Sequence, residues 1–328
     1  MASAPRLRPA SGRPGAIAIC LVLIVRLAAP SGPAAQAGPV AAGEPWKWRL
    51  PPGFPTPRVP SDNPMSEARV ELGRRLFYDT RLSANRSQAC ATCHRQEKAF
   101  TDSRARAVGS TGEIHRRGSM SLTNVAYAAS LTWAGRDPRV LEAQVLIPLL
   151  GTHPVERGMG GREAELVARL ETDPGYAILF EAAFPGEDRP VSVANVTRAI
   201  ACFERILVSG DSPYDRLVFR GQTDALSESA WRGMRLFFSE QLACSRCHAG
   251  FNFSAPVDFE RLPKAPEPQF HNTGLYNLDG RGAYPAADTG LRETTGRRHD
   301  MGRFKAPTLR NIELTATQVL PKLRHLSE

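Results

Sequence analysis

Apolar residues recur at intervals of three and four along several stretches of this chain, a spacing that places them on one face of an α-helix. The stretch 192–208 shows the pattern most clearly, and its apolar positions are Val193, Val196, Ile200, Phe203 and Leu207. We expect a helix there that closes at Gly210, because glycine is common directly after a helix. Residues 64–78 carry the same pattern over charged neighbours, which predicts a second amphipathic helix.

The rest of the pattern is also mainly helical. Further helical segments are predicted at 139–150, 162–171, 176–183 and 227–239. Alternating strand patterns are scarce, so the expected fold class is mainly α. Two stretches show neither the helical nor the strand spacing of apolar residues. Residues 38–63 are rich in proline, glycine and alanine and predict an extended arm, and residues 255–295 predict long irregular loops.

A short sequence is repeated in two of these helical segments. Residues 73–78 read GRRLFY and residues 233–238 read GMRLFF. Each copy is followed by a pair of cysteines, in the same order. A repeat of this kind indicates two related units in tandem.

The cysteine pairs belong to two copies of one pentapeptide, CATCH at residues 90–94 and CSRCH at residues 244–248. Two thiols one helical turn apart, followed directly by histidine, are the attachment signature of a c-type haem. The thiols bond the porphyrin and the histidine binds its iron. A single copy could also be half of a zinc site or a redox dithiol, but the residues between the copies hold no further histidine or cysteine cluster to complete a zinc site.

We therefore expect two covalently bound haem c groups. The first would be attached to Cys90 and Cys93 and the second to Cys244 and Cys247. The proximal iron ligands would be His94 and His248. A haem fills space that side chains fill elsewhere, which agrees with the long irregular segments.

The N-terminus has the pattern of a secretory signal peptide, predicted at residues 1–37. Arginines precede an apolar run at residues 15–25, and Ala-Gln-Ala at residues 35–37 fits a small-residue cleavage signal. The run is too short for a comfortable membrane span, so no span is expected after cleavage. Export to the periplasm agrees with the haem motifs, because c-type haem is attached outside the cytoplasmic membrane in bacteria.

Charge and cysteine content limit the function classes. The 328 residues carry a formal net charge of +9, and loss of the four arginines of the leader would lower it to +5. This excess is mild, and no basic patch alternates with aromatic residues, so a nucleic-acid partner is not expected. Cys202 lies on an apolar helix face, where a buried, inert thiol is expected.

Four further motifs accompany the haem motifs, and they read GSTGE at 109–113, RGSMSL at 117–122, HPVE at 153–156 and HNTGLYN at 271–277. In this order, the motifs resemble those of the bacterial di-haem cytochrome c peroxidase superfamily, most closely its MauG- and MbnH-related branch. The resemblance covers nearly all of the chain after the leader. It implies a peroxidatic cytochrome c-like domain at 64–210 and a second cytochrome c-like domain at 211–328.

Enzymes of that branch use hydrogen peroxide to form high-valent haem iron and oxidise a partner protein. The resemblance therefore implies a periplasmic, peroxidase-type oxidoreductase. Enzymes of the MbnH type are associated with oxidation of a tryptophan in a small copper-binding partner. Two other functions stay open: a cytochrome c peroxidase that takes electrons from a small cytochrome c, and a di-haem electron carrier without catalysis or an inactive truncated product.

The resemblance also assigns roles to single residues. Glu156 matches the glutamate that moves a proton between the peroxide oxygens at the His94 haem, and Trp133 matches the tryptophan between the haems. From the residues alone, Glu156 could be a solvated loop carboxylate and Trp133 a core side chain. His115 lies in the loop that supplies a capping iron ligand in the cytochrome c peroxidases, but at a different spacing from Trp133, so a surface loop histidine is the alternative.

The C-terminal segment departs from the family pattern. Residues 304–311 follow it, but Thr317 stands where proline is expected and the residues after it match no family motif. We expect a truncated or frame-shifted product that lacks the family's sixth ligand for the second haem, with Met301 and His325 as substitute candidates. The family also implies a calcium ion. Thr317 replaces the proline of a turn that helps to hold this ion in the family, and Gly118 stands where an asparagine ligand occurs. These two differences put the calcium site in doubt.

Overall fold

The computed structural model describes residues 46–315, and within that range the chain forms helices and isolated β-bridges but no strand. The mainly α fold with long irregular loops is thus confirmed. The α-helices are α1 (Glu67–Phe77), α2 (Cys90–Cys93), α3 (Leu141–Leu150), α4 (Glu163–Glu171), α5 (Pro174–Ala183), α6 (Val193–Arg205), α7 (Pro213–Arg220), α8 (Glu228–Phe237), α9 (Arg292–Thr295) and α10 (Ile312–Thr315). Single 3₁₀ turns lie at η1 (Thr80–Leu82), η2 (Gln96–Lys98), η3 (Val125–Tyr127), η4 (Cys244–Arg246) and η5 (Arg298–Asp300).

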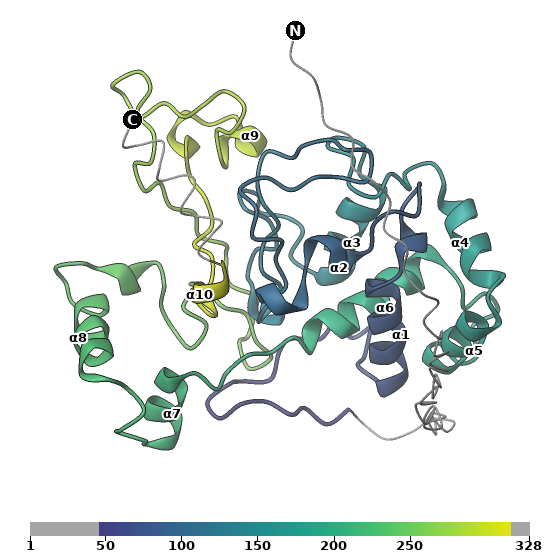
Figure 1. The fold of residues 1–328 in the computed structure, drawn as a ribbon, viewed down its shortest axis with the longest axis horizontal. Helices are drawn as coiled ribbons and strands as arrows, with labels where there is room; N and C mark the ends of the chain where they lie inside the picture. Colours follow the sequence, from purple (N-terminus) through teal and green to yellow (C-terminus); the bar gives the residue numbers. More distant parts are fainter. Residues whose placement is uncertain (1–45, 316–328) are drawn as a thin grey trace, which may run out of the picture. The chain divides into compact units, whose positions relative to one another are not determined.

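Helices α1 and α6 cross at the centre of the largest apolar core (Figure 1). Each begins at a serine whose side chain accepts a hydrogen bond from the backbone N–H three residues on, Ser66 in α1 and Ser192 in α6. Gly73 lies at the crossing, where an added Cβ would be 1.9 Å from the carbonyl oxygen of Ala199. The absence of a side chain at Gly73 therefore lets the two helix backbones approach each other.

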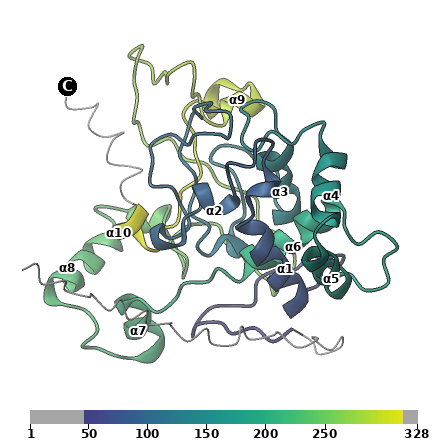
Figure 2. The same ribbon diagram turned by 45° about the vertical axis from the view of Figure 1, so that its right-hand side comes forward.

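Helices α3, α4 and α5 surround this pair, and all six helical segments predicted from periodicity contain a helix. Helix α7 was not predicted. The sequence nevertheless contains a signal for the start of this helix. Ser212 and Asp215 form a capping box, and Pro213 lies in the first turn. Helices α7 and α8 lie on the far side of α6 from α4 and α5 in both views (Figures 1 and 2). Helix α8 has no buried residue.

The interpretation of Gly210 as a helix-closing residue was wrong, because α6 ends at Arg205 and is capped by Ile206. Gly210 instead allows close packing of the arm: an added Cβ would lie 2.7 Å from the ring of Phe54. Residues 46–63 contain no helix and carry Phe54 to the rings of Tyr127 and Phe251. The predicted leader at 1–37 and the start of the arm lie outside the described residues.

No helix between residues 46 and 315 is long and apolar enough to cross a bilayer.

Candidate functional site

The first haem motif lies on helix α2, which places Cys90 and Cys93 one helical turn apart on the wall of a cavity of about 710 Å³. His94 follows the helix directly and also lines the cavity. Its Nδ1 is 2.9 Å from the carbonyl oxygen of Phe100, so Nδ1 carries the proton and Nε2 is the nitrogen available to a metal. Burial lowers the pKa of His94, which favours the neutral ring that binds iron.

The cavity fits a covalently attached haem. Its volume lies in the range of buried cofactor sites. Apolar side chains from three elements, among them Leu82, Val145 and Ile200, line it together with the two thiols and the imidazole. This combination of two thiols on one turn, an oriented histidine and an apolar chamber is what the predicted haem c requires.

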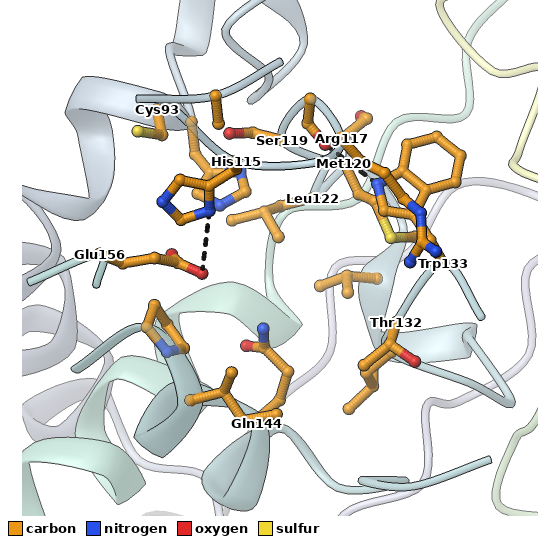
Figure 3. Close-up of a pocket in the computed structure, with 18 of the residues that line it drawn as sticks. Cys93, His115, Arg117, Ser119, Met120, Leu122, Thr132, Trp133, Gln144 and Glu156 are labelled. Atoms are coloured by element: carbon orange, nitrogen blue, oxygen red, sulfur yellow. Dashed lines mark hydrogen bonds and ion pairs between the residues drawn. The ribbon is translucent and has the colours of Figure 1, made fainter. Parts of the chain in front are cut away.

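Glu156 and His115 lie together on one side of this cavity, with His115 Nδ1 3.9 Å from Glu156 Oε1 (Figure 3). The His115 side chain is 10% exposed and that of Glu156 is 38% exposed. Burial raises the pKa of Glu156, and the nearby His115 and Arg157 oppose that rise. The Nε2 of His115 is buried and has no hydrogen-bond partner among the described residues. The pair can therefore hold and move a proton inside the cavity.

Trp133 lies on the opposite side of the cavity (Figure 3). Its indole N–H donates a hydrogen bond to the carbonyl oxygen of Gly118 at 3.0 Å. Gly118 has no room for a side chain, because an added Cβ would lie 2.1 Å from the carbonyl oxygen of Arg104. The carbonyl oxygen of Gly118 thus orients the indole of Trp133.

The second haem motif has the same local arrangement of cysteines and histidine as the first. Cys244 and Cys247 bracket the turn η4, and His248 Nδ1 lies 3.1 Å from the carbonyl oxygen of Phe253. Large apolar side chains next to the motif are about half exposed, namely Leu236 (49%), Phe238 (47%) and Leu242 (52%). The motif therefore offers the donors and the apolar surroundings that a second haem needs.

The loop after the second haem motif reaches the cavity that Trp133 lines. Asn252 and Ser254 line the same cavity as Trp133, and they flank Phe253, the residue that orients His248. The hydroxyl of Ser254 donates to the carbonyl oxygen of Ala306 at 2.8 Å. Trp133 and the two residues that flank Phe253 thus line the same cavity.

The candidate sixth ligands are only partly within the described residues. His115 lines the first cavity, and Met301 follows the turn η5, where its carbonyl oxygen accepts a hydrogen bond from Asn272. His325 lies outside the described residues. Residues 46–315 contain no cluster of three or more histidine, cysteine, aspartate or glutamate side chains that could hold a metal ion.

Sequence reasoning missed several residues of the site. Gln144 projects into the cavity from α3 (Figure 3), and its isolated polar side chain in an apolar helix was the available signal. Pro148 lies inside α3, and its carbonyl oxygen accepts a hydrogen bond from the N–H of Arg157, next to Glu156. His271, which begins the HNTGLYN motif and does not line this cavity, has a buried Nε2 without a partner in the described range. Burial, Arg303 and His248 lower its pKa.

The sequence of this chain is similar to those of known di-haem proteins. Residues 67–224 match the family model of di-haem cytochrome c peroxidases. The methylamine utilization protein MauG of Methylorubrum extorquens is 35% identical over 271 residues, which cover 82% of this chain and 68% of the relative. The chain belongs to the di-haem cytochrome c peroxidase family. It is therefore a haem peroxidase-type oxidoreductase, and the family implies two haem groups.

Both branches of the family occur among its relatives. The cytochrome c551 peroxidase of Pseudomonas aeruginosa is 32% identical over 253 residues, 77% of this chain and 67% of the relative. A solved structure of a MauG-like protein associated with microbial copper homeostasis is 46% identical and covers 82% of this chain and 77% of the other, with a TM-score of 0.79.

Proposed function

We propose that this protein uses hydrogen peroxide to oxidise a side chain of a partner protein, as a MauG- or MbnH-type enzyme. One observation carries the proposal: the cavity at His94 has a proton-handling pair, Glu156 and His115, on one side and Trp133 on the other. A haem bound to His94 supplies an iron that binds and reduces peroxide. The cavity therefore combines a place for peroxide with a path for electrons toward the second motif.

Each residue has a distinct task in this proposal. The Glu156 carboxylate would accept a proton from one oxygen of hydrogen peroxide and pass it to the other, so that the O–O bond breaks and water leaves. A haem held by Cys90, Cys93 and His94 would supply the two electrons. His115 Nδ1 lies 3.9 Å from Glu156 Oε1, so a protonated imidazole there would attract the carboxylate. Trp133 provides an oxidisable ring between the two haem motifs.

We propose two haem c groups in cytochrome c-like domains at 64–210 and 211–328, and a periplasmic location that the predicted leader at 1–37 supports. The partner would be a small copper-binding protein. The similarity to a MauG-like protein associated with microbial copper homeostasis supports that choice.

One observation favours a second candidate, a cytochrome c peroxidase that takes electrons from a small cytochrome c. His115 lines the first cavity, and its Nε2 has no hydrogen-bond partner within residues 46–315. It could therefore bind the iron and be released on reduction, as in the family's peroxidases. Optical and EPR spectra of the oxidised holoprotein distinguish the two. A five-coordinate, high-spin His94 haem supports the MauG-type proposal, and a low-spin bis-histidine haem that His115→Gln converts to high spin supports the peroxidase.

The products test the proposal directly. The holoprotein is mixed with peroxide and either the copper-binding partner or a reduced small cytochrome c, and both are followed by mass spectrometry and absorbance. We expect added oxygen on a partner tryptophan. Stoichiometric cytochrome oxidation without a modified partner would support the peroxidase, and spectra of both haems that do not respond to peroxide would leave only an electron carrier.

A further inference from the structure

The GSTGE motif at 109–113 forms the turn of a short hairpin, residues 107–117. The N–H of Gly109 donates to the carbonyl oxygen of Glu113 at 2.8 Å and closes the turn. Gly112 has a φ of +87°, a conformation that favours glycine. The turn is therefore made by backbone atoms and glycines, and it does not need the side chain of Glu113.

The hairpin contacts the segment that carries Glu156 at three points. Glu113 Oε2 accepts a hydrogen bond from the N–H of Val155 at 3.0 Å. The N–H of Ser110 donates to the carbonyl oxygen of Glu156 at 2.8 Å. Gly109 lies against the same segment, because an added Cβ there would be 1.9 Å from the carbonyl oxygen of Val155. These contacts fix the backbone directly before and directly after the Cα of Glu156.

The chain after Glu156 is held by other parts of the fold. The N–H of Arg157 donates to the carbonyl oxygen of Pro148 in α3 at 3.0 Å. The guanidinium of Arg157 is buried and donates to the carbonyl oxygen of Gln88 at 2.8 Å. Loss of the Glu113 carboxylate would therefore loosen only the side that precedes Glu156, while Arg157 stays in place.

The same hairpin carries His115, two residues after Glu113. The N–H of His115 donates to the carbonyl oxygen of Ala107 across the hairpin at 2.8 Å. The imidazole Nδ1 lies 3.9 Å from Glu156 Oε1. The hairpin that binds the Val155 N–H thus also presents the histidine to the glutamate, so one short element places both members of the proton-handling pair.

We propose that Glu113 is a positioning residue for Glu156. Its carboxylate, bound to the N–H of Val155, keeps the Glu156 carboxyl beside His115 and in place for proton transfer. The inference rests on the proposed function, because it assumes that Glu156 moves a proton between the peroxide oxygens. Glu113 is exposed and acts only through the backbone before Glu156, so its effect should vanish when Glu156 cannot take the proton.

Stopped-flow mixing of the holoprotein with peroxide, followed at the absorption band of the first haem, tests the inference. Glu113→Ala should slow the reaction about tenfold, because a small displacement of a catalytic group lowers the rate steeply. Glu113→Gln should react nearly as fast as the unaltered protein, since an amide oxygen can accept the same hydrogen bond. Exposed Glu171, at the end of α4, provides the control, and Glu171→Ala should leave the rate unchanged.

A double variant separates positioning from general damage to the fold. In protein that already carries Glu156→Gln, the added Glu113→Ala should cause no further slowing, because the proton acceptor is already lost. A purely structural role of Glu113 would slow both backgrounds by the same factor. Equal slowing in the two backgrounds would therefore overturn the proposal.

Hydrogen exchange measured by mass spectrometry checks the contact without peroxide. Glu113→Ala should speed exchange in the peptide that contains the N–H of Val155, and Glu113→Gln should not, because the bonded amide opens more often when its acceptor is lost. Peptides from α1 should be unchanged in both variants. Unaltered exchange at Val155 in Glu113→Ala would contradict the assigned contact.

The outcomes distinguish failure of the two proposals. If peroxide changes neither haem spectrum in the unaltered protein, or if Glu156→Gln reacts as fast as the original, the proposed function fails. If Glu156→Gln is slow but Glu113→Ala is not, only the role of Glu113 is overturned. Equal slowing by Glu113→Ala and Glu113→Gln would also overturn it, because the hydrogen bond would then not be the cause.

Discussion

At the scale of single residues, the cavity depends on the protonation of Glu156. Burial raises the pKa of this carboxyl above its ordinary value, and only the ionised form can accept a proton from peroxide. The rate of the optical change with peroxide should therefore fall as pH decreases through the raised pKa. Glu156→Gln should lower the rate about 10²- to 10⁴-fold and remove this acid limb, as measured by stopped flow.

Glu97 supplies the control for this substitution. Its carboxylate is exposed and pairs with Arg95 at the surface, so Glu97→Gln should leave rate and pH profile unchanged. A Glu156→Gln protein that reacts as fast as the original, with the same acid limb, would remove Glu156 from the proposed proton transfer.

At the scale of helices, the two copies of the Gly-x-Arg-Leu-Phe sequence have different surroundings. An added Cβ at Gly73 would overlap the carbonyl oxygen of Ala199, whereas one at Gly233 would meet no atom within 4 Å. Gly73→Ala should therefore force α1 and α6 apart and cost about 3 kcal/mol of unfolding free energy. Gly233→Ala should be stabilising by about 0.5–1 kcal/mol, because alanine is the better helix former.

Chemical denaturation of the two variants in parallel measures this contrast. Each variant serves as the control of the other, since the substitution is the same and both glycines begin a Gly-x-Arg-Leu-Phe sequence. Equal destabilisation of both variants would mean that α8 also packs through Gly233, which would contradict the exposure of Gly233.

At the scale of the whole molecule, a buried ion pair joins α7 to the segment before α10. Arg310 Nη2 lies 2.8 Å from Asp215 Oδ1, and both side chains are 3% exposed. The guanidinium also lies 4.9 Å from the ring centre of Phe54 and 5.4 Å from that of Phe253. The pair therefore connects the N-terminal arm, the loop after His248 and the C-terminal segment.

Removal of Asp215 or of Arg310 should strongly destabilise the folded protein, because the remaining charged side chain would stay buried without its partner. Asp215→Ala or Arg310→Ala should each cost about 3–5 kcal/mol, and the double substitution less than the sum. Burial alone would raise the pKa of Asp215, but hydrogen bonds from Arg310 and Ser212 outweigh it and lower the pKa. The stability from this pair should be present at neutral pH and be lost as pH falls through that lowered pKa.

A thermodynamic cycle from denaturant unfolding measures the coupling. The exposed pair of Arg74 and Glu71 on α1 is the comparison, and it should show a coupling below about 1 kcal/mol. Equal coupling energies for the two pairs would contradict the structural role of Asp215 and Arg310.

Much of the candidate site could be predicted from the sequence where a few neighbouring residues suffice. The spacing of Cys90, Cys93 and His94 within one turn predicts haem attachment because the second motif repeats it. The role of Glu156 and Trp133 came from family resemblance, because neither residue carries a local signal. Their shared cavity, and the contact of Glu156 with His115, depend on loops folded far from each other along the chain.

The sequence by itself determined the mainly helical fold and the haem-attachment motifs, because helix periodicity, capping and thiol spacing act within one or two turns. Only the tertiary structure decided which glycine lies under a helix crossing, why Gly210 is a glycine, and that Glu113 binds the segment before Glu156. These depend on packing between segments far apart in the sequence. The physical reason is that burial and close approach belong to the folded chain and not to any short stretch of it.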